Sequence, residues 1–120
     1  MASLAGRRVL VVEDETLVAM LVEDTLADAG VVVIGPAATV AESLALLEKD
    51  RPDLAVLDLN LAGETSEPVA EALIRMGVPF VVASGYGAAG LPQRLANVPV
   101  LAKPYAPEDL TAALARLPAG

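Results

Sequence analysis

Five polar residues that could act together follow short apolar runs at separate points of the chain. Glu13 and Asp14 follow the first run, Asp58 closes the third, Ser84 follows the fourth and Lys103 follows the fifth. Carboxylates that share one place repel each other unless a cation binds among them. A lysine and a hydroxyl can compensate negative charge on the oxygens of a phosphoryl group. If the fold gathers these side chains, they would form a phosphoryl-transfer site.

Each of these residues also has a purely structural interpretation. Asp14 could cap the helix that follows it, with Glu13 and Glu15 adding favourable charge at the helix N-terminus. Ser84 precedes a glycine and suits an ordinary turn, and a lysine before a proline suits a solvated surface position. Asp58 differs, because an acid that closes a buried strand loses hydration and needs a cation. The functional interpretation therefore depends on the whole set coming together.

The elements that would position these residues alternate between strand and helix. Five runs rich in valine lack polar alternation, which is typical of strands buried on both faces. These runs span residues 9–12, 31–34, 54–57, 80–83 and 98–102. The clearest helical spacing between them comprises Leu17, Val18, Leu21, Val22, Leu26 and Ala29. Gly30 is expected to stop that helix.

Three further segments have helical spacing. Their apolar positions are, in chain order, Val40, Leu44 and Leu47; Val69, Leu73 and Met76; Leu110, Leu114 and Leu117. Pro68 fits the first turn of the middle segment and Gly77 its end, while Pro107 opens the last. The fourth crossover is crowded with Gly and Pro from residue 85 to 92, so any helix over residues 88–96 should be short or mobile.

Strict alternation of strand and helix implies a parallel sheet with helices on both faces and right-handed crossovers. Such doubly wound α/β sheets bind ligands beyond the carboxyl ends of their strands, where the strand order reverses. The five polar residues all stand at strand ends of this kind. Their clustering is therefore expected from strand-end placement alone.

Composition limits the chemistry that this site could perform. The chain of 120 residues contains no cysteine and no histidine. It therefore has no thiol nucleophile and no thiolate metal site, and it lacks the commonest general base. With 55% hydrophobic residues, the chain can bury about two-thirds of its unfolded surface, which suffices for one compact domain. Chemistry must then rest on carboxylates, hydroxyls and lysine.

The net charge of −8 limits the kinds of partner that this chain can bind. Nucleic-acid phosphates and anionic membrane surfaces would both repel this chain, so we expect neither as a partner. Divalent cations and basic protein surfaces fit better. No segment has the pattern of a signal peptide or of a membrane span, and we expect a cytoplasmic location.

Oxygen ligands in a small cavity suit Mg²⁺, which keeps several of its waters. The cluster of Glu13, Asp14 and Asp58 therefore predicts a Mg²⁺-dependent reaction. Asp58 is the best-placed nucleophile and would give an aspartyl phosphate. Lys103 and Ser84 would compensate the charge on the phosphoryl oxygens.

Four short motifs carry a resemblance to a known family. They are Val11-Val12-Glu13-Asp14-Glu15, Leu57-Asp58-Leu59-Asn60, Ala83-Ser84-Gly85 and Lys103-Pro104-Tyr105. In order and spacing they resemble the CheY-like receiver domains of bacterial two-component response regulators, over essentially the whole chain. The resemblance implies a flavodoxin-like sheet of five parallel strands in the order 2-1-3-4-5.

The resemblance also implies a role for each site residue. Asp58 would accept the phosphoryl group from the phosphohistidine of a sensor histidine kinase or of a histidine phosphotransfer protein. Asp14, Asp58 and the backbone carbonyl of Asn60 would bind Mg²⁺, with Glu13 assisting through water. Ser84 would donate a hydrogen bond to one phosphoryl oxygen, and the lysine would pair with another. Such a domain is not an enzyme but a phosphoacceptor that assists its own phosphorylation and dephosphorylation.

The chain departs from the common family pattern at the position three residues before the lysine. Many receivers carry an aromatic switch residue there, and this chain has Val100. Residues 79–86 instead resemble the subgroup called FATGUY, and this likeness suggests a kinase of the HWE or HisKA2 type. Ser84, Tyr86 and Tyr105 are then the switch candidates, although both tyrosine rings could equally cover apolar surface. The Gly-rich segment 85–92 is the element that phosphorylation would order.

Two rival functions fit part of the pattern. A Mg²⁺-dependent phosphatase with an aspartyl-phosphate intermediate would need Asp-x-Asp after the first strand, which is missing, and Asn60 cannot act as its general acid. A phosphorylation-independent interaction module would have no reason to gather uncompensated carboxylates.

We expect residues 1–120 to form a single receiver domain with no output domain. Its output would then be a partner protein. The domain could act as a diffusible signal, as an intermediate carrier in a phosphorelay, or as a sink that drains phosphate from a kinase, and the sequence does not choose among these roles.

Overall fold

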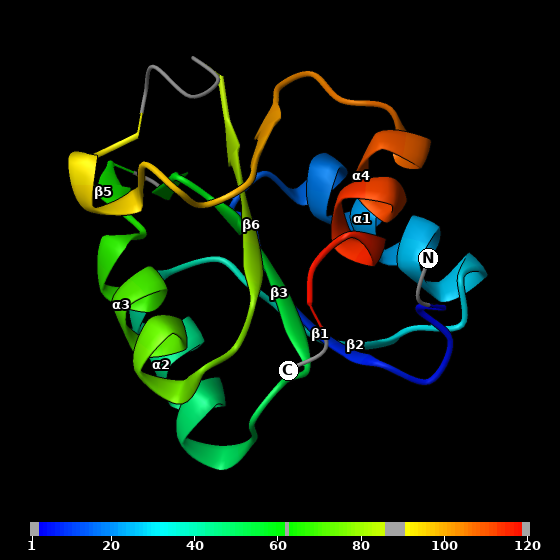
Figure 1. Ribbon diagram of the computed structural model, residues 1–120, viewed down its shortest axis with the longest axis horizontal. Coiled ribbons are helices and arrows are strands. Elements are labelled where there is room, and N and C mark those ends of the chain that lie inside the picture. The colour runs from blue at the N-terminus through cyan, green and yellow to red at the C-terminus, as the bar shows by residue number, and fades with distance from the viewer. Residues whose placement is uncertain (1–2, 62, 86–90, 119–120) are drawn as a thin grey trace.

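The computed structural model describes residues 3–61, 63–85 and 91–118 (Figure 1). A parallel sheet crosses the middle of the molecule in the order β2-β1-β3-β6-β7. Its strands are β1 (Arg8–Val12), β2 (Val32–Ala37), β3 (Leu54–Asp58), β6 (Phe80–Ser84) and β7 (Val100–Ala102). In chain order these are the five predicted strands, so the predicted order 2-1-3-4-5 is confirmed.

Helices cover both faces of this sheet. Figure 1 shows α2 (Val40–Lys49) and α3 (Glu67–Met76) on one side, and α1 (Thr16–Asp28) and α4 (Pro107–Ala115) on the other. Pro68 lies in the first turn of α3, and Gly77 ends the helix in a left-handed conformation with φ of 72°. A left-handed C-terminal residue favours glycine because it has no Cβ to clash.

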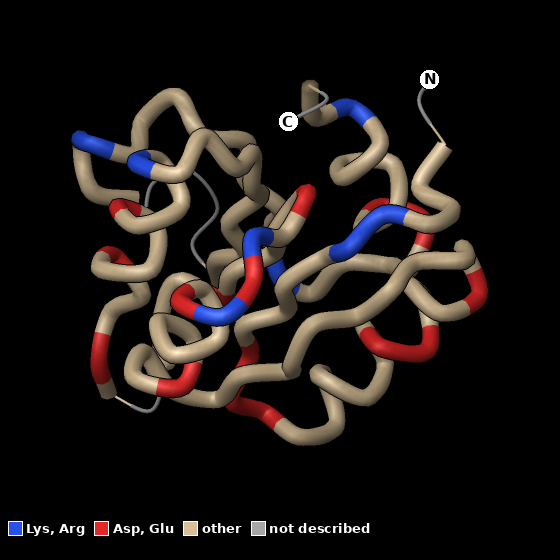
Figure 2. Tube along the Cα trace, turned by 90° about the horizontal axis from the view of Figure 1, so that it is seen from below, with Lys and Arg blue, Asp and Glu red and all other residues tan. Residues whose placement is uncertain are grey.

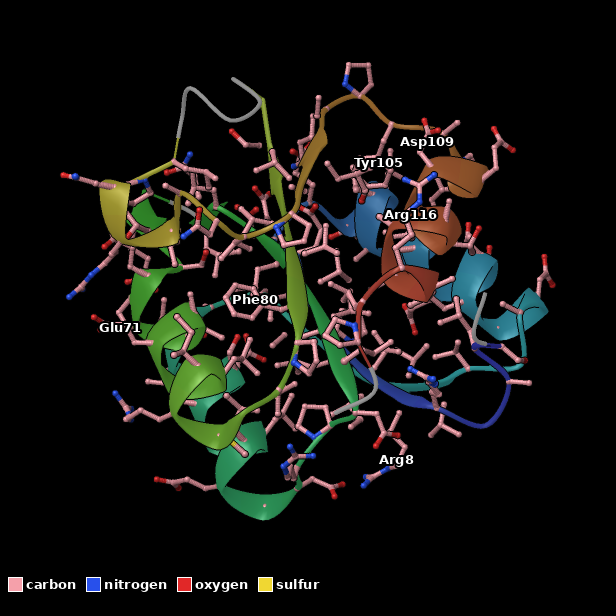
Figure 3. The ribbon with its side chains drawn as sticks, viewed as in Figure 1. Arg8, Glu71, Phe80, Tyr105, Asp109 and Arg116 are labelled. Atoms are coloured by element: carbon pink, nitrogen blue, oxygen red, sulfur yellow. The ribbon has the colours of Figure 1, made fainter. Side chains whose placement is uncertain are left out.

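Alternating strand residues divide the core into two apolar clusters. In β1, Leu10 and Val12 pack on the side of α2 and α3, while Val9 and Val11 pack on the side of α1 and α4. The division follows from the pleat, which turns successive side chains to opposite faces. Figure 3 shows Phe80 on the α3 side of β6, in keeping with its place in the first cluster. The strands that carry the polar residues are thus fixed from both sides.

The amino end of the sheet is fastened by charged residues. Arg8 forms an ion pair with Asp50, and its backbone N–H donates to Asp53 Oδ2 at 2.9 Å. Figure 2, seen from below, shows acidic and basic residues interspersed on this side of the molecule. These contacts join the start of β1 to the turn before β3.

The prediction of burial on both faces is wrong for the two edge strands: Ala102 is exposed in β7, which is shorter than the predicted run, and the second strand differs more. The strand begins and ends later than the predicted run, and Val32 is exposed. The physical reason is position, because β2 is an edge strand with a neighbour on one side only. The apolar run was correct as a strand, but its composition did not show that it lies at an edge.

Helix α1 buries less of its apolar surface than the sequence suggested. Val22 and Leu26 are buried, but Leu17 is 81% exposed and Leu21 is also exposed. The apolar stripe is wider than the face that the sheet can cover, so its outer edge is left on the surface.

The helix in the described part of the fourth crossover is short, as predicted. Among the described residues this crossover contains only the 3-10 helix η2 (Gln93–Leu95), which is anchored by the buried Leu95. Arg94 pairs with Glu71 of α3, and its Nη1 also lies 3.9 Å from Glu67 Oε2. Residues 86–90, the rest of the predicted switch segment, lie outside the described part of the chain.

A small hairpin after β3 was not predicted. Strands β4 (Asn60–Leu61) and β5 (Glu64–Thr65) pair antiparallel beside the sheet, and Leu61 is fully buried. Glu64 Oε1 accepts a hydrogen bond from Val40 N at 3.2 Å, in the first turn of α2. The hairpin is therefore tied to a neighbouring helix rather than left as a free loop.

In the described part of the chain, no helix combines the length and the apolar character needed to cross a bilayer.

A matched pair of substitutions in α1 tests this packing. Replacing Leu26 by Ala should lower the free energy of unfolding by about 2–5 kcal/mol, because it leaves a cavity in the core. Replacing the exposed Leu17 by Ala should change it by about 0.5 kcal/mol or less. Urea unfolding followed by circular dichroism measures both. Equal losses at the two positions would contradict the orientation of α1.

Candidate functional site

The predicted polar residues stand at the same edge of the sheet. Glu13 directly follows β1, Asp58 ends β3 and Ser84 ends β6. Lys103 directly follows β7, and its backbone N–H donates to the carbonyl of Ser84 at 3.0 Å. Because these strands are parallel and adjacent in the order β1-β3-β6-β7, their carboxyl ends meet. Figure 1 shows this edge at the top of the view.

Three carboxyl groups form a cluster at this edge. Oxygen atoms of Glu13, Asp14 and Asp58 all lie within 4.8 Å of one another. Glu13 is 5% exposed and Asp58 is 7% exposed, so both carboxyl groups are largely removed from water. Glu13 Oε2 accepts a hydrogen bond from Glu15 N at 3.1 Å. Grouped oxygen donors of this kind have the chemistry that Mg²⁺ prefers.

Lys103 supplies the positive charge within this cluster. Its Nζ lies 2.8 Å from Asp58 Oδ2 and 3.4 Å from Glu13 Oε1. Burial lowers the pKa of this ammonium group, but the hydrogen bond and charge of Asp58, followed by Glu13, outweigh it and raise the pKa above its usual value. The lysine is therefore held as a cation that faces the phosphoacceptor candidate.

Glu13 is electrostatically the most perturbed of the acids. Its pKa is raised to about 7: burial is the largest cause and the neighbouring Asp58 also raises the pKa, while the hydrogen bond from the Glu15 N–H and the charge of Lys103 lower it. A carboxyl group in this range is partly protonated at neutral pH. A divalent cation would have to displace that proton in order to use Glu13 as a ligand.

The hairpin after β3 forms the wall opposite the lysine. Asn60 N lies 3.4 Å from Asp58 Oδ1 and donates to it, and Asn60 pairs with Thr65 across the hairpin. The cluster opens to solvent through a depression of about 600 Å³. Its lining residues are Asp14, Glu15, Asp58, Asn60, Gly63, Gly85 and Lys103. The opening can admit a phosphoryl group together with hydrated metal.

The described switch candidates are Ser84 and Tyr105, since Tyr86 lies outside the described residues. Ser84 is buried at the end of β6. Tyr105 is half-buried and packs against the apolar cluster beneath α1 and α4. Burial first, and then the charge of Glu13, raise the pKa of the Tyr105 hydroxyl. Figure 3 places Tyr105 near α1 and the start of α4.

One residue at the site was missed as a participant. The sequence favoured Glu15 only as helpful charge at a helix N-terminus, but its Oε1 lies 3.8 Å from Lys103 Nζ. The only signal was its place two residues after Glu13. The sequence could not show that the lysine, far along the chain, would come within reach of it.

An acid cluster, a hydroxyl and a lysine at the carboxyl edge of a doubly wound parallel sheet define a CheY-like phosphoacceptor domain of two-component signalling. The family described as response regulator receiver domain matches residues 9–115, and the chain belongs to it. Receivers are signalling domains rather than conventional enzymes.

Solved relatives have the same fold. SdrG from Sphingomonas melonis Fr1 is 42% identical, with a TM-score of 0.81 over 96% of this chain and 97% of that one. A second structure, the BeF3-activated conformation of SdrG from Pseudomonas melonis Fr1, is 40% identical with a TM-score of 0.77, covering 96% and 97% of the two chains. The response regulator PhyR from Brucella abortus is 30% identical with a TM-score of 0.76, over 91% of this chain and 46% of that one.

Among curated proteins, the chain is similar to the transcriptional regulatory protein PdtaR of Mycobacterium tuberculosis. It is 29% identical over 112 residues, which are 90% of this chain and 55% of PdtaR. The chain thus spans about half the length of the curated relative that it matches.

The raised pKa of Glu13 predicts a pH-dependent metal affinity. Below pH 7 the protonated carboxyl group no longer attracts a cation, so the Mg²⁺ dissociation constant should increase several-fold between pH 8 and pH 6. Replacing Glu13 by Gln should flatten this dependence, because no proton is then displaced. Isothermal titration calorimetry at the two pH values measures it. The same pH dependence in parent and variant would exclude Glu13 as the cause.

Proposed function

We propose that this receiver domain accepts a phosphoryl group on Asp58 from a phosphohistidine, in a Mg²⁺-dependent reaction, and signals through a downstream protein. The observation that carries the proposal is the contact of 2.8 Å between Lys103 Nζ and Asp58 Oδ2. This contact joins a cationic side chain to a buried carboxylate at the floor of an open acidic depression. Asp58 as nucleophile and Lys103 as the cation that offsets the negative charge of the phosphoryl group thus lie side by side.

The chemistry can be assigned to this chain's own atoms. A carboxylate oxygen of Asp58 forms a bond to phosphorus while the phosphorus–nitrogen bond of the phosphohistidine breaks and imidazole leaves. Lys103 then moves its ion pair from the carboxylate to a phosphoryl oxygen, and the Ser84 hydroxyl donates to another oxygen. Asp14, Asp58 and the Asn60 carbonyl would hold Mg²⁺, with Glu13 assisting through water. The bound ion would supply positive charge against the phosphoryl oxygens.

The surface of α1 supports a protein as the phosphoryl donor. Leu17, Met20 and Leu21 are exposed on this helix. Of these, Leu21 lines a groove of about 360 Å³ together with Glu15, Val18, Lys103, Pro104 and Tyr105, and the groove shares Glu15 and Lys103 with the depression at the site. An apolar patch at the mouth of a polar site is typical of a protein-docking surface. We propose a sensor histidine kinase or a histidine phosphotransfer protein as the docked donor, and a kinase of the HWE or HisKA2 type is the prediction that the FATGUY likeness suggests.

The phosphoryl transfer can be tested by intact-protein mass. Incubation with acetyl phosphate and Mg²⁺ should add a single phosphoryl group to the parent protein. The adduct should disappear when a chelator replaces Mg²⁺, and also in the Asp58→Asn variant, which keeps the shape of the side chain but removes the nucleophile. Asp28→Asn, at an exposed position of α1, is the matched control and should be phosphorylated like the parent.

Other outcomes distinguish the rival functions. A folded protein that gains no adduct, beside an active control receiver, would favour a phosphorylation-independent interaction module. Sustained turnover of small phosphomonoesters, lost in Asp58→Asn, would favour a phosphatase.

A substitution on α1 tests the docking of a protein donor. Replacing Leu17 by Gln should slow transfer from a phosphorylated kinase or phosphotransfer protein roughly fivefold or more, because it puts a polar amide into an apolar contact. The rate with acetyl phosphate should stay within about twofold of the parent, because the small donor does not need this surface and the net charge is unchanged. Ile74→Gln, at an exposed position of α3 on the other side of the sheet, is the control. Equal slowing with both kinds of donor would reject the docking surface.

A further inference from the structure

The Glu15 side chain lies at the mouth of the site and does not cap helix α1, although its backbone carbonyl accepts a hydrogen bond from Ala19 N. Glu15 is the N-cap residue of α1, yet its side chain makes no capping hydrogen bond within the described part of that helix. The side chain is 66% exposed, lines the depression, and lies 3.8 Å from Lys103 Nζ through Oε1. Its backbone N–H supports Glu13, and its carboxylate faces the opening.

The negative charge of Glu15 has no role in the proposed phosphoryl transfer. When Glu13 has lost its proton, Glu13, Asp14 and Asp58 together carry at most three negative charges, which Lys103 and one divalent cation would balance. Glu15 adds a fourth negative charge in the lining of the depression that leads to Asp58. An anion that binds Lys103 inside the depression therefore comes close to this carboxylate, which lies 3.8 Å from the lysine.

Glu15 also borders the apolar groove beside the site. The groove of about 360 Å³ has Val18, Leu21 and Tyr105 in its lining, and Glu15 belongs to both the groove and the depression. A protein donor that covers the groove can place its own groups opposite Glu15 and offset the charge. A small anion that arrives through solvent brings no such compensation.

We propose that Glu15 is a specificity-determining residue that disfavours small, highly charged phosphodonors relative to a docked protein. The inference rests on the proposed function and deepens it. With acetyl phosphate, a bond forms from an Asp58 oxygen to phosphorus while the bond from phosphorus to the acetate oxygen breaks, and acetate leaves with the electron pair. With phosphoramidate the same bond forms, and the protonated nitrogen leaves as ammonia. The two donors differ in net charge, about −2 and −1, and this difference isolates the electrostatic effect.

The first measurement compares the two donors at saturating Mg²⁺. In Glu15→Gln the rate with acetyl phosphate should rise about two- to fivefold, because Glu15 and Asp58 both contact Lys103 and one unit charge repels a dianion at roughly 8 Å by about this factor in a water-like, partly screened medium. The rate with phosphoramidate should rise less. Both gains should shrink at about 1 M salt, where the Debye length is about 3 Å.

A second measurement separates charge from structural damage. Removing a carboxylate near the metal ligands should weaken Mg²⁺ binding, so the dissociation constant by calorimetry should increase while the rate at saturating Mg²⁺ also increases. A loosened site would bind less metal and react more slowly. Glu15→Ser, with a residue well suited to the N-cap position, removes the same charge without weakening α1 and should give the same gains.

The matched control is Glu48→Gln. Glu48 is exposed near the end of α2, and Figure 1 shows that helix end at the bottom of the view, away from the carboxyl ends of the strands. This variant should leave both donor rates and the Mg²⁺ affinity unchanged.

The outcomes are distinguishable. If the parent takes a phosphoryl group but both Glu15 variants react like it, or respond equally to both donors, the role of Glu15 is overturned and the proposed function stands. If the folded parent takes a phosphoryl group from neither donor, both fall.

Discussion

The ion pair between Lys103 and Asp58 is the constraint on which the rest of the site depends. A carboxylate that is 7% exposed needs a cationic partner, because burial of an unpaired charge is costly. The lysine comes from the last strand and the acid from the third, with β6 between them in the sheet. The pair therefore forms only if the strands align, and the hydrogen bond from Lys103 N to the Ser84 carbonyl fixes that alignment.

A rigid scaffold surrounds this pair. The residues of β3 and β6 are buried throughout, and the alternating side chains of β1 lock into two separate apolar clusters. Groups held at the ends of such strands have little freedom to move, which suits a site that must keep carboxylates close together. The hairpin adds support from the side, because Glu64 joins it to the first turn of α2. The open side of the site, by contrast, is bordered by Glu15 and by the exposed apolar residues of α1.

Much of the fold could be predicted because its elements follow strong local patterns. Apolar runs marked the strands, Gly77 marked the end of α3 and Pro107 the start of α4, each for a reason of backbone geometry. The errors concern relations between elements. An apolar run looks the same in an edge strand as in a central one, so the exposure of Val32 was missed. The hairpin of β4 and β5 was missed because two-residue strands have no periodicity to detect.

The sequence by itself determined the parallel sheet with helices on both faces and the identity of the clustered residues, because strand and helix alternate and the carboxyl ends of parallel strands converge at one edge. The strand order was predicted from the resemblance to receiver domains. The sequence also determined the absence of thiol and imidazole chemistry, which composition alone decides. Only the tertiary structure decided the distances and their electrostatic effects. The pKa of Glu13 depends on burial by distant segments, and the reach of Glu15 to Lys103 depends on two loops that meet only in the folded chain. Local sequence patterns encode helices and strands, whereas the electrostatic field at a site is the sum of contributions from residues that are remote in sequence.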